Sequence, residues 1–227
     1  MPCALRNGLS FCEVDGQLIF LDVDNDRYFQ LSEPLRHSFL CYMARKDACA
    51  THAACLIEHG ILVESSADSD HGQDPIFEHP SNSAIELTRS RTGASFDLLL
   101  EVFAIVCWTK LQLKTKGLKS ILLSLNQVRE ESTQRNAPAE NDPIGISGLL
   151  KAASVFREAR IFVPVETRCL LDSIAIVKFL ARRHFHANIV IGVTGDPFSA
   201  HCWAQIHDMV LNDTVGNVRS FTPIRVI

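Results

Sequence analysis

The chain has 227 residues, of which 47% are hydrophobic and 21% charged, and its formal net charge is −4 at pH 7. This composition is typical of a globular protein, and the slight acidic excess argues against nucleic acid as a partner, since phosphate recognition favours a basic surface. Eight cysteines are too few for a disulfide framework in a chain of this length, and the first residues lack the apolar core of a signal peptide. We therefore expect a cytosolic protein with free thiols.

The first third of the sequence predicts a small module of strands followed by helices. The expected elements are strands over residues 10–14, 17–21 and 27–31 and helices from residue 33 and over residues 48–59. Asp15-Gly16 between the first two strands is a strong hairpin-turn signal. Ser32 is a plausible N-cap, and Gly60 a plausible C-terminal cap, for the helices. We expect this module to end at about residue 65.

The composition changes after this module. Residues 66–93 are rich in Ser, Asp, His and Pro, few of which can pack in a core, so they predict a linker. The elements expected beyond it are helices over residues 94–115, 118–129, 148–160 and 168–183 and strands over residues 188–193, 201–206 and 209–211. The run 96–113 contains three charged residues, which favours a buried helix over a membrane span. Helices followed by antiparallel strands predict an α+β domain over residues 94–227.

Three residues of this domain form a candidate catalytic set. Cys169 lies just inside the expected start of a buried helix, where free backbone N–H groups and the helix dipole stabilise a thiolate. His201 begins one strand and Asp213 ends the next, so a base and its orienting carboxylate can meet beside the helix end. This is the arrangement of nucleophile, base and orienting group in cysteine catalysis. The residues alone are also compatible with a buried cysteine, an edge histidine and a turn aspartate without a catalytic role.

Two other clusters invite a metal interpretation. Residues 22–26 resemble the opening of a calcium loop, but Arg27 stands where the sharp turn of such a loop requires glycine. Four zinc-type side chains recur at helical spacing: Cys49, His52, Cys55 and His59. Four ligands along one helix lie in a line and cannot surround a tetrahedral ion, so we expect no metal and no other cofactor. A metal-dependent regulator that uses Cys49 and His52 stays an alternative.

Five short motifs follow one another around the candidate set: Arg168-Cys169-Leu170, Ile191-Gly192-Val193, Pro197-Phe198, Ala200-His201-Cys202-Trp203 and Val210-Leu211-Asn212-Asp213. In order and spacing they resemble the transglutaminase-like core of the lasso-peptide leader peptidases, the B proteins of lasso-peptide biosynthesis. The resemblance covers residues 148–227. It implies a papain/transglutaminase-like domain with Cys169 as nucleophile, His201 as base and Asp213 as third member. Asp172 and Ser173 depart from the family pattern.

The first 65 residues resemble the PqqD-like, winged-helix element that binds precursor leaders in the same family. Together the two resemblances imply a leader-recognition element over residues 1–65, a linker over residues 66–93 and a cysteine peptidase domain over residues 94–227. Such an enzyme would bind a ribosomally made lasso-peptide precursor, cleave its leader from its core, and pass the core to a macrolactam synthetase (cyclase) partner. A transglutaminase-type acyl transferase and a non-catalytic precursor-binding adapter stay open as alternatives.

Overall fold

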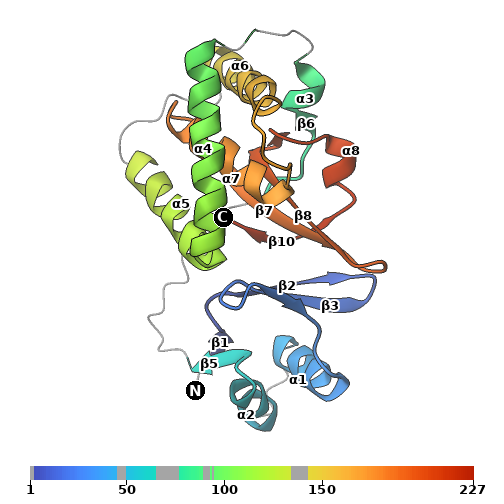
Figure 1. The fold of residues 1–227 in the computed structure, drawn as a ribbon. Helices are drawn as coiled ribbons and strands as arrows, with labels where there is room; N and C mark the ends of the chain where they lie inside the picture. The colour runs from blue at the N-terminus through green and yellow to red at the C-terminus, as the bar shows by residue number, and fades with distance from the viewer. Residues whose placement is uncertain (1–2, 45–49, 65–76, 89–92, 94, 134–142) are drawn as a thin grey trace. The chain divides into compact units, whose positions relative to one another are not determined.

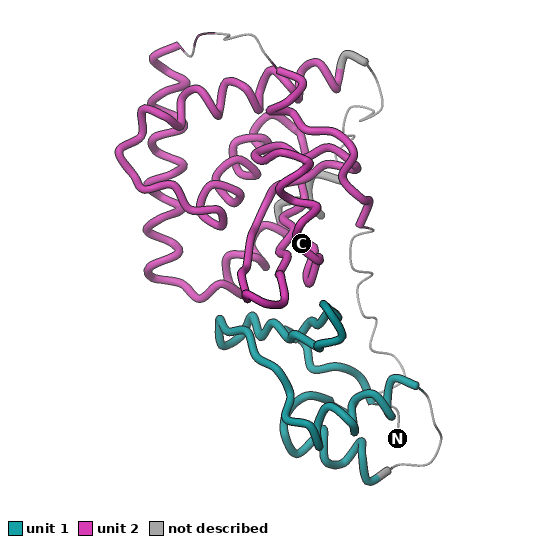
Figure 2. The backbone as a smooth tube through the Cα atoms, turned by 90° about the vertical axis from the view of Figure 1, so that its right-hand side faces the viewer, with its two compact units in different colours: residues 1–74 teal, residues 75–227 magenta. Residues whose placement is uncertain are grey.

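Two units make up the chain, and they separate between Asp74 and Pro75 (Figure 2). The computed structural model describes residues 3–44, 50–64, 77–88, 93, 95–133 and 143–227. Each unit has its own cluster of buried apolar side chains. Among the helices of these described residues, none combines the length and apolar character that crossing a bilayer requires.

The first unit pairs a three-stranded antiparallel sheet with two helices and a short two-stranded ribbon (Figure 1). Its elements are β1 (Cys3–Leu5), β2 (Leu9–Val14), β3 (Gln17–Asp22), β4 (Arg27–Phe29), α1 (Glu33–Met43), α2 (Ala50–Glu58) and β5 (Leu62–Glu64). The sheet order is β2-β3-β4, and β1 pairs antiparallel with β5. The predicted strands and helices are thus confirmed with small shifts at their ends, whereas the pairing of β1 with β5 was not foreseen.

Local sequence explains the hairpin at the start of this unit. Val14 pairs with Gln17, so only Asp15 and Gly16 form the turn. Both have positive φ angles, 51° and 76°, as a tight hairpin of the primed type requires. The sheet then packs its phenylalanines on α1, and the ring of Phe20 lies between 5.1 and 5.6 Å from three other rings, those of Phe11, Phe29 and Phe39.

Asp22 holds together the loops around this sheet. Its carboxylate is fully buried and forms an ion pair with Arg6 at 2.9 Å. It also accepts hydrogen bonds from the backbone N–H and the side chain of Asn25. Burial would raise the pKa of Asp22, but these hydrogen bonds and the Arg6 charge outweigh it and lower the pKa. Arg6 also donates to the carbonyl of Gly60, so the residues that resemble a calcium loop serve the packing of the unit.

The second unit is a mixed α and β domain built around one buried helix (Figure 1). Its elements are β6 (Asn82–Ser83), α3 (Ala84–Leu87), α4 (Phe96–Thr115), α5 (Leu118–Thr133), α6 (Pro143–Arg160), α7 (Cys169–Ala181), β7 (Asn188–Thr194), β8 (Ser199–Ile206), β9 (Met209–Val210), α8 (Val215–Val218) and β10 (Thr222–Val226). The sheet order is β10-β7-β8-β9-β6, with antiparallel pairs except for the parallel pair β6 and β9.

Helix α7 occupies the centre of this unit. It contacts α4 and α6 on one side and strands β7 and β8 of the sheet on the other. Nine of its side chains are buried: Leu171, Asp172, Ser173, Ile174, Ala175, Ile176, Val177, Phe179 and Leu180. A helix that is apolar around most of its girth is stable only when covered on all sides, which is why the sequence pattern predicted burial here. Its first residue, Cys169, is exposed at the helix end.

Part of the predicted linker belongs to the second unit. Strand β6 pairs with β9, with Asn82 opposite Met209 and Ser83 opposite Val210. Pro80 accepts a hydrogen bond from Arg219, and the backbone carbonyl of Glu78 accepts one from Gln205. The prediction of a linker over residues 66–93 was therefore wrong for residues 77–88. These residues are polar, so composition alone did not indicate that they form hydrogen bonds with the edge of the sheet. Residues 66–76 and 89–92 lie outside the described part of the chain.

Candidate active site

Cys169 is the first residue of α7, and the helix start is capped from within the helix. The N-cap is Arg168, which has an extended conformation and makes no side-chain cap. The side chain of Asp172 takes over this role by accepting the backbone N–H of Arg168 at 3.2 Å. An acidic group in the first turn also complements the helix dipole. Cys169 thus stands where the unpaired N–H groups of a helix favour a thiolate.

The loop that precedes Cys169 is fixed by Arg160 at the end of α6. Arg160 donates to Asp172 Oδ1 at 2.6 Å, and both side chains are almost buried, at 11% and 12% exposure. The same guanidinium donates to three backbone carbonyls of the loop: Val163, Val165 and Glu166. A planar group with five donors suits this task, because it can bind a carboxylate and several carbonyls at once. The position of the helix start is therefore set by side chains of two helices.

His201 and Asp213 meet at the sheet, as the sequence predicted. His201 Nε2 lies 2.5 Å from Asp213 Oδ2, and each side chain is 19% exposed. The other neighbour of the imidazole is Cys169, which is hydrogen-bonded to His201. Because Nε2 is engaged by the carboxylate, Nδ1 is the ring nitrogen left to interact with the thiol. The structure therefore brings all three residues of the candidate set together, although 44 positions separate the first from the last.

Asp213 is itself held by three hydrogen bonds that the sequence did not reveal. Its Oδ1 accepts the backbone N–H of Thr214 at 2.7 Å, and its Oδ2 accepts the amide of Asn217 at 2.7 Å. Its backbone carbonyl accepts the hydroxyl of Ser83 from β6 at 2.6 Å. An asparagine four residues after the aspartate is the only sequence signal of this support. The carboxylate consequently has one orientation in which it can face His201.

The pKa values within the set shift in the directions that favour an ion pair. The hydrogen bond from His201 lowers the pKa of the Cys169 thiol despite its partial burial, with help from the backbone N–H groups of Cys202 and Leu170. The hydrogen bond to Asp213 raises the pKa of His201 to about 9, and the contact with Cys169 adds to this shift. Burial would raise the pKa of Asp213, but the hydrogen bonds it accepts lower it. The lowered pKa of Cys169 and the raised pKa of His201 both favour the thiolate–imidazolium pair over the neutral thiol and imidazole.

Aromatic packing fixes the plane of the imidazole. The ring of His201 stacks on Trp203 at 6.1 Å between centroids and lies 5.0 Å from the ring of Phe221. Trp203 is fully buried, so it belongs to the core and does not line a cleft. Gly192 lies opposite His201 in the sheet, and a Cβ there would meet Trp203 at 2.8 Å and Phe221 at 2.9 Å. This close approach explains the glycine between two buried β-branched residues.

A buried polar network connects α7 to the strands. Asn212 accepts the backbone N–H of Ala204 at 2.8 Å and donates to Ser173 Oγ at 2.9 Å. Ser173 in turn donates to the carbonyl of Cys202 at 3.0 Å. Asp172 and Ser173, which depart from the resembled family pattern, therefore both bond α7 to neighbouring segments. The roles of Asp172 and Ser173 cannot be read from local sequence, because their partners Arg160, Cys202 and Asn212 lie at least 12 positions away.

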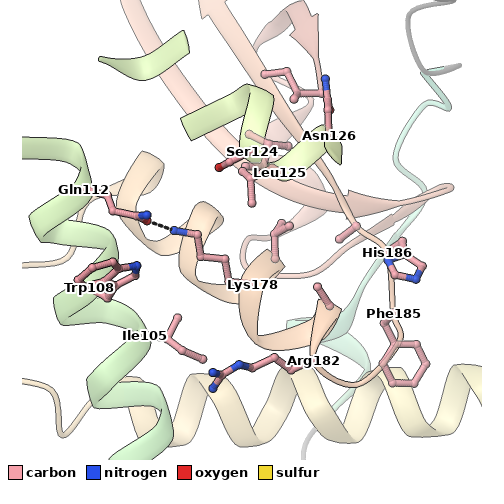
Figure 3. Close-up of a pocket in the computed structure, with 15 residues that line it drawn as sticks. Ile105, Trp108, Gln112, Ser124, Leu125, Asn126, Lys178, Arg182, Phe185 and His186 are labelled. Atoms are coloured by element: carbon pink, nitrogen blue, oxygen red, sulfur yellow. Dashed lines mark hydrogen bonds between the residues drawn. The ribbon is translucent and has the colours of Figure 1, made fainter. Parts of the chain in front are cut away.

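A separate pocket of about 380 Å³ lies between α4, α5 and α7 (Figure 3). Trp108 and Ile105 give it an apolar wall, and Lys178 extends into it and donates to Gln112 at 2.5 Å. Burial, together with the nearby charge of Lys116, lowers the pKa of Lys178 to about 8. None of the three residues of the candidate catalytic set lines this pocket. It is therefore not the site at which those residues would meet a substrate.

A cysteine at the start of a buried helix, beside a histidine on an antiparallel strand and an aspartate in the loop after the next strand, is the arrangement of transglutaminase-like domains. The family model of the transglutaminase-like superfamily matches residues 113–226, half of the chain, and the chain belongs to this superfamily. It is similar to the microcin J25-processing protein McjB of Escherichia coli, with 29% identity over 118 residues, 52% of this chain and 50% of that protein. The match thus spans about half the length of the curated relative. No solved structure matches the chain.

Proposed function

We propose that the protein is a cysteine peptidase that cleaves the leader from a ribosomally made lasso-peptide precursor. The observation that carries the proposal is the hydrogen-bonded series from Cys169 through His201 to Asp213, with the cysteine at a helix start. Superfamily membership and the similarity to a microcin-processing protein support the reaction class and the substrate class. Because the similarity covers half of that relative, the substrate and partners of this chain are part of the proposal.

The reaction begins with attack of the Cys169 thiolate on the scissile carbonyl carbon. The backbone N–H groups at the start of α7 face the developing oxyanion, and the helix dipole lowers its energy. His201 Nδ1 donates its proton to the leaving amine as the C–N bond breaks, which leaves a thioester on the leader side and a neutral imidazole. Asp213 keeps the ring oriented and stabilises its charged form.

Water completes the cycle. The neutral His201 takes a proton from the attacking water, and the oxygen bonds to the thioester carbon. Collapse of the tetrahedral intermediate breaks the C–S bond, releases the leader as a carboxylic acid that loses its proton to solvent, and restores the thiolate–imidazolium pair. The freed core has an amino terminus, and we propose that a macrolactam synthetase then consumes it. An amine in place of water would give acyl transfer, and the same three residues would serve that reaction.

The test is mass spectrometry of a precursor peptide after incubation with purified protein. We expect cleavage at a single bond and a thioester-linked leader trapped at early times. Cys169→Ala is expected to abolish both products, whereas Cys107→Ser, a half-buried thiol of α4, is the matched control and is expected to retain them. Cleavage by Cys169→Ala at the wild-type rate would overturn the proposed nucleophile. A product joined to an added amine, in place of the hydrolysed leader, would favour the acyl transferase.

For the first unit we propose leader recognition by strand addition. The free edges of its sheet are β2 and β4, and an extended peptide can pair with either through main-chain hydrogen bonds. The unit has its own buried core around Phe20 and Phe39, so a fragment of residues 1–74 is expected to fold. Calorimetric titration of this fragment with leader peptide is the direct measurement. Proline substitutions along the leader should weaken binding at alternate positions, and absence of binding by a folded fragment would remove this role.

A further inference from the structure

His37, Cys41 and His52 form a cluster that the proposed peptidase does not use. His37 and Cys41 are one turn apart on α1, and His52 faces them from α2. One ring nitrogen of each histidine and the cysteine sulfur all lie within 4.8 Å of one another. No fourth histidine, cysteine or carboxylate joins them among the residues that the structure describes. Two helices therefore offer three nitrogen and sulfur ligands to one point in space.

The distances within the cluster fit a tetrahedral zinc ion. Zinc bonds of about 2.3 Å to sulfur and about 2.0 Å to nitrogen place these two atoms about 3.5 Å apart at the tetrahedral angle. Cys41 Sγ lies 3.6 Å from His37 Nε2. The separations within the cluster reach up to 4.8 Å, so binding of the ion also requires small side-chain rotations, and the side chain of His37 is exposed. Imidazole and thiolate are also the ligands that zinc prefers over magnesium or calcium.

The hydrogen bonds of the buried Ser38 determine which ring nitrogen of His52 carries the proton. Ser38 Oγ donates its only proton to the carbonyl of Pro34 at 3.0 Å. Toward His52 Nδ1, 3.0 Å away, it can therefore act only as an acceptor, so the proton of the neutral imidazole lies on Nδ1. Nε2 of His52 keeps its lone pair and is the nitrogen available to a metal. A hydrogen bond from the second ring nitrogen to a fixed acceptor is the usual support of a histidine ligand.

We propose that His37, Cys41 and His52 bind a zinc ion that links α1 to α2 in the first unit. The fourth tetrahedral position is left to water. Cys41 binds as the thiolate, so its thiol proton is released when the ion binds. The site uses two helices and so avoids the geometric objection to four ligands along α2. His52 belongs to it, whereas Cys55 and His59 do not, and Cys49 lies outside the described residues.

Cobalt(II) titration of the metal-free, full-length protein tests the site, because a thiolate ligand gives a charge-transfer absorption that an imidazole does not. We expect one equivalent to bind, with this absorption present and lost again on addition of zinc. Cys41→Ser is expected to remove the absorption, and His37→Ala to weaken zinc binding more than 100-fold. Ser38→Ala is expected to weaken it about 10- to 100-fold, as for other second-sphere partners.

Matched variants separate this site from the other thiols. Cys55→Ser and His59→Ala change a second cysteine–histidine pair of the same i,i+4 spacing, at the C-terminal end of α2, where Sγ and Nδ1 lie 4.0 Å apart, and should leave the titration unchanged. Cys169→Ala removes the thiolate of the catalytic set and should leave it unchanged too. Because His37 is exposed, His37→Ala is expected to keep the wild-type circular dichroism, so its loss of binding is not a loss of fold.

The same site predicts a stability readout. Zinc in excess should raise the thermal midpoint of the wild-type protein relative to a chelator, since only the folded unit offers the assembled ligands. Cys41→Ser should show no such rise. No binding by the wild-type protein, survival of the charge-transfer absorption in Cys41→Ser, or its loss in Cys55→Ser would each overturn the proposal.

Discussion

The hydroxyl of Ser173 in α7 accepts a hydrogen bond from Asn212 at 2.9 Å, and this contact joins the helix that begins at Cys169 to the strands that present His201 and Asp213. Ser173 is fully buried and also donates to the carbonyl of Cys202, the neighbour of His201. The distance between nucleophile and base is therefore held by a polar contact in the core. Such a network is costly to break, because its members have no water to bond to instead.

Removal of this contact should affect both stability and the reactivity of the thiol. Ser173→Ala leaves the amide of Asn212 and the carbonyl of Cys202 without a partner, which should cost about 1–3 kcal/mol of unfolding free energy. We expect a slower reaction of Cys169 with iodoacetamide at pH 7. Ser154→Ala is the matched control, since Ser154 is buried in α6 and bonds only within that helix to Glu158. If both variants lose stability and neither changes alkylation, Ser173 does not position the site.

The pH dependence of the reaction should report the thiolate–imidazolium pair. Because the pKa of the Cys169 thiol is lowered, its alkylation should already be fast well below pH 8.5, the ordinary range of cysteine. Precursor cleavage should fall as pH rises through about 9, since the raised pKa of His201 keeps the proton needed by the leaving amine up to that point. His201→Ala should move the alkylation profile to higher pH. An unchanged profile in this variant would mean that His201 does not stabilise the thiolate.

Asp213 and Asn217 should contribute unequally to the rate of cleavage. Asp213→Asn removes the charge that raises the pKa of His201, so single-turnover cleavage should fall strongly, by at most about 10⁴-fold, and its alkaline limb should move to lower pH. Asn217→Ala removes one of the donors that orient Asp213, and a loss of about tenfold is expected. Equal losses in the two variants, with both proteins folded, would contradict the assignment of Asn217 to a supporting role.

Gly192 should be intolerant of any side chain. In Gly192→Ala the new methyl group would lie 2.8 Å from the Trp203 ring and 2.9 Å from Phe221 Cβ, so the aromatic packing beneath His201 must shift. Overpacking of this kind costs about 1–3 kcal/mol, and cleavage should fall with it. Gly216→Ala in α8 is the control, because nothing lies within 4 Å of the added carbon. Equal thermal midpoints and equal activities for the two variants would show that the close approach is not limiting.

The sequence by itself determined the helices, strands and turns that depend only on residues close together in the chain. The apolar girth of α7 predicted a buried helix, Asp15-Gly16 predicted the first hairpin, and the alternation of apolar and turn residues predicted β7 and β8. The positions of Cys169 at a helix start and of His201 and Asp213 close to strand ends allowed their convergence without requiring it, and the structure brings the three together. Their catalytic roles stay a prediction.

Only the tertiary structure decided the contacts between residues that are far apart in the chain. Composition predicted a linker where β6 completes the sheet, since Ser83 and its neighbours are polar yet satisfy an edge strand. The bonds of Arg160 to Asp172 and of Asn212 to Ser173 have no local signature, because either partner alone could face solvent. The sequence pattern grouped His52 with Cys49, Cys55 and His59 at helical spacing, whereas the fold places it beside His37 and Cys41 of α1. Local sequence patterns determine the helices and strands, and tertiary packing determines which polar side chains come into contact.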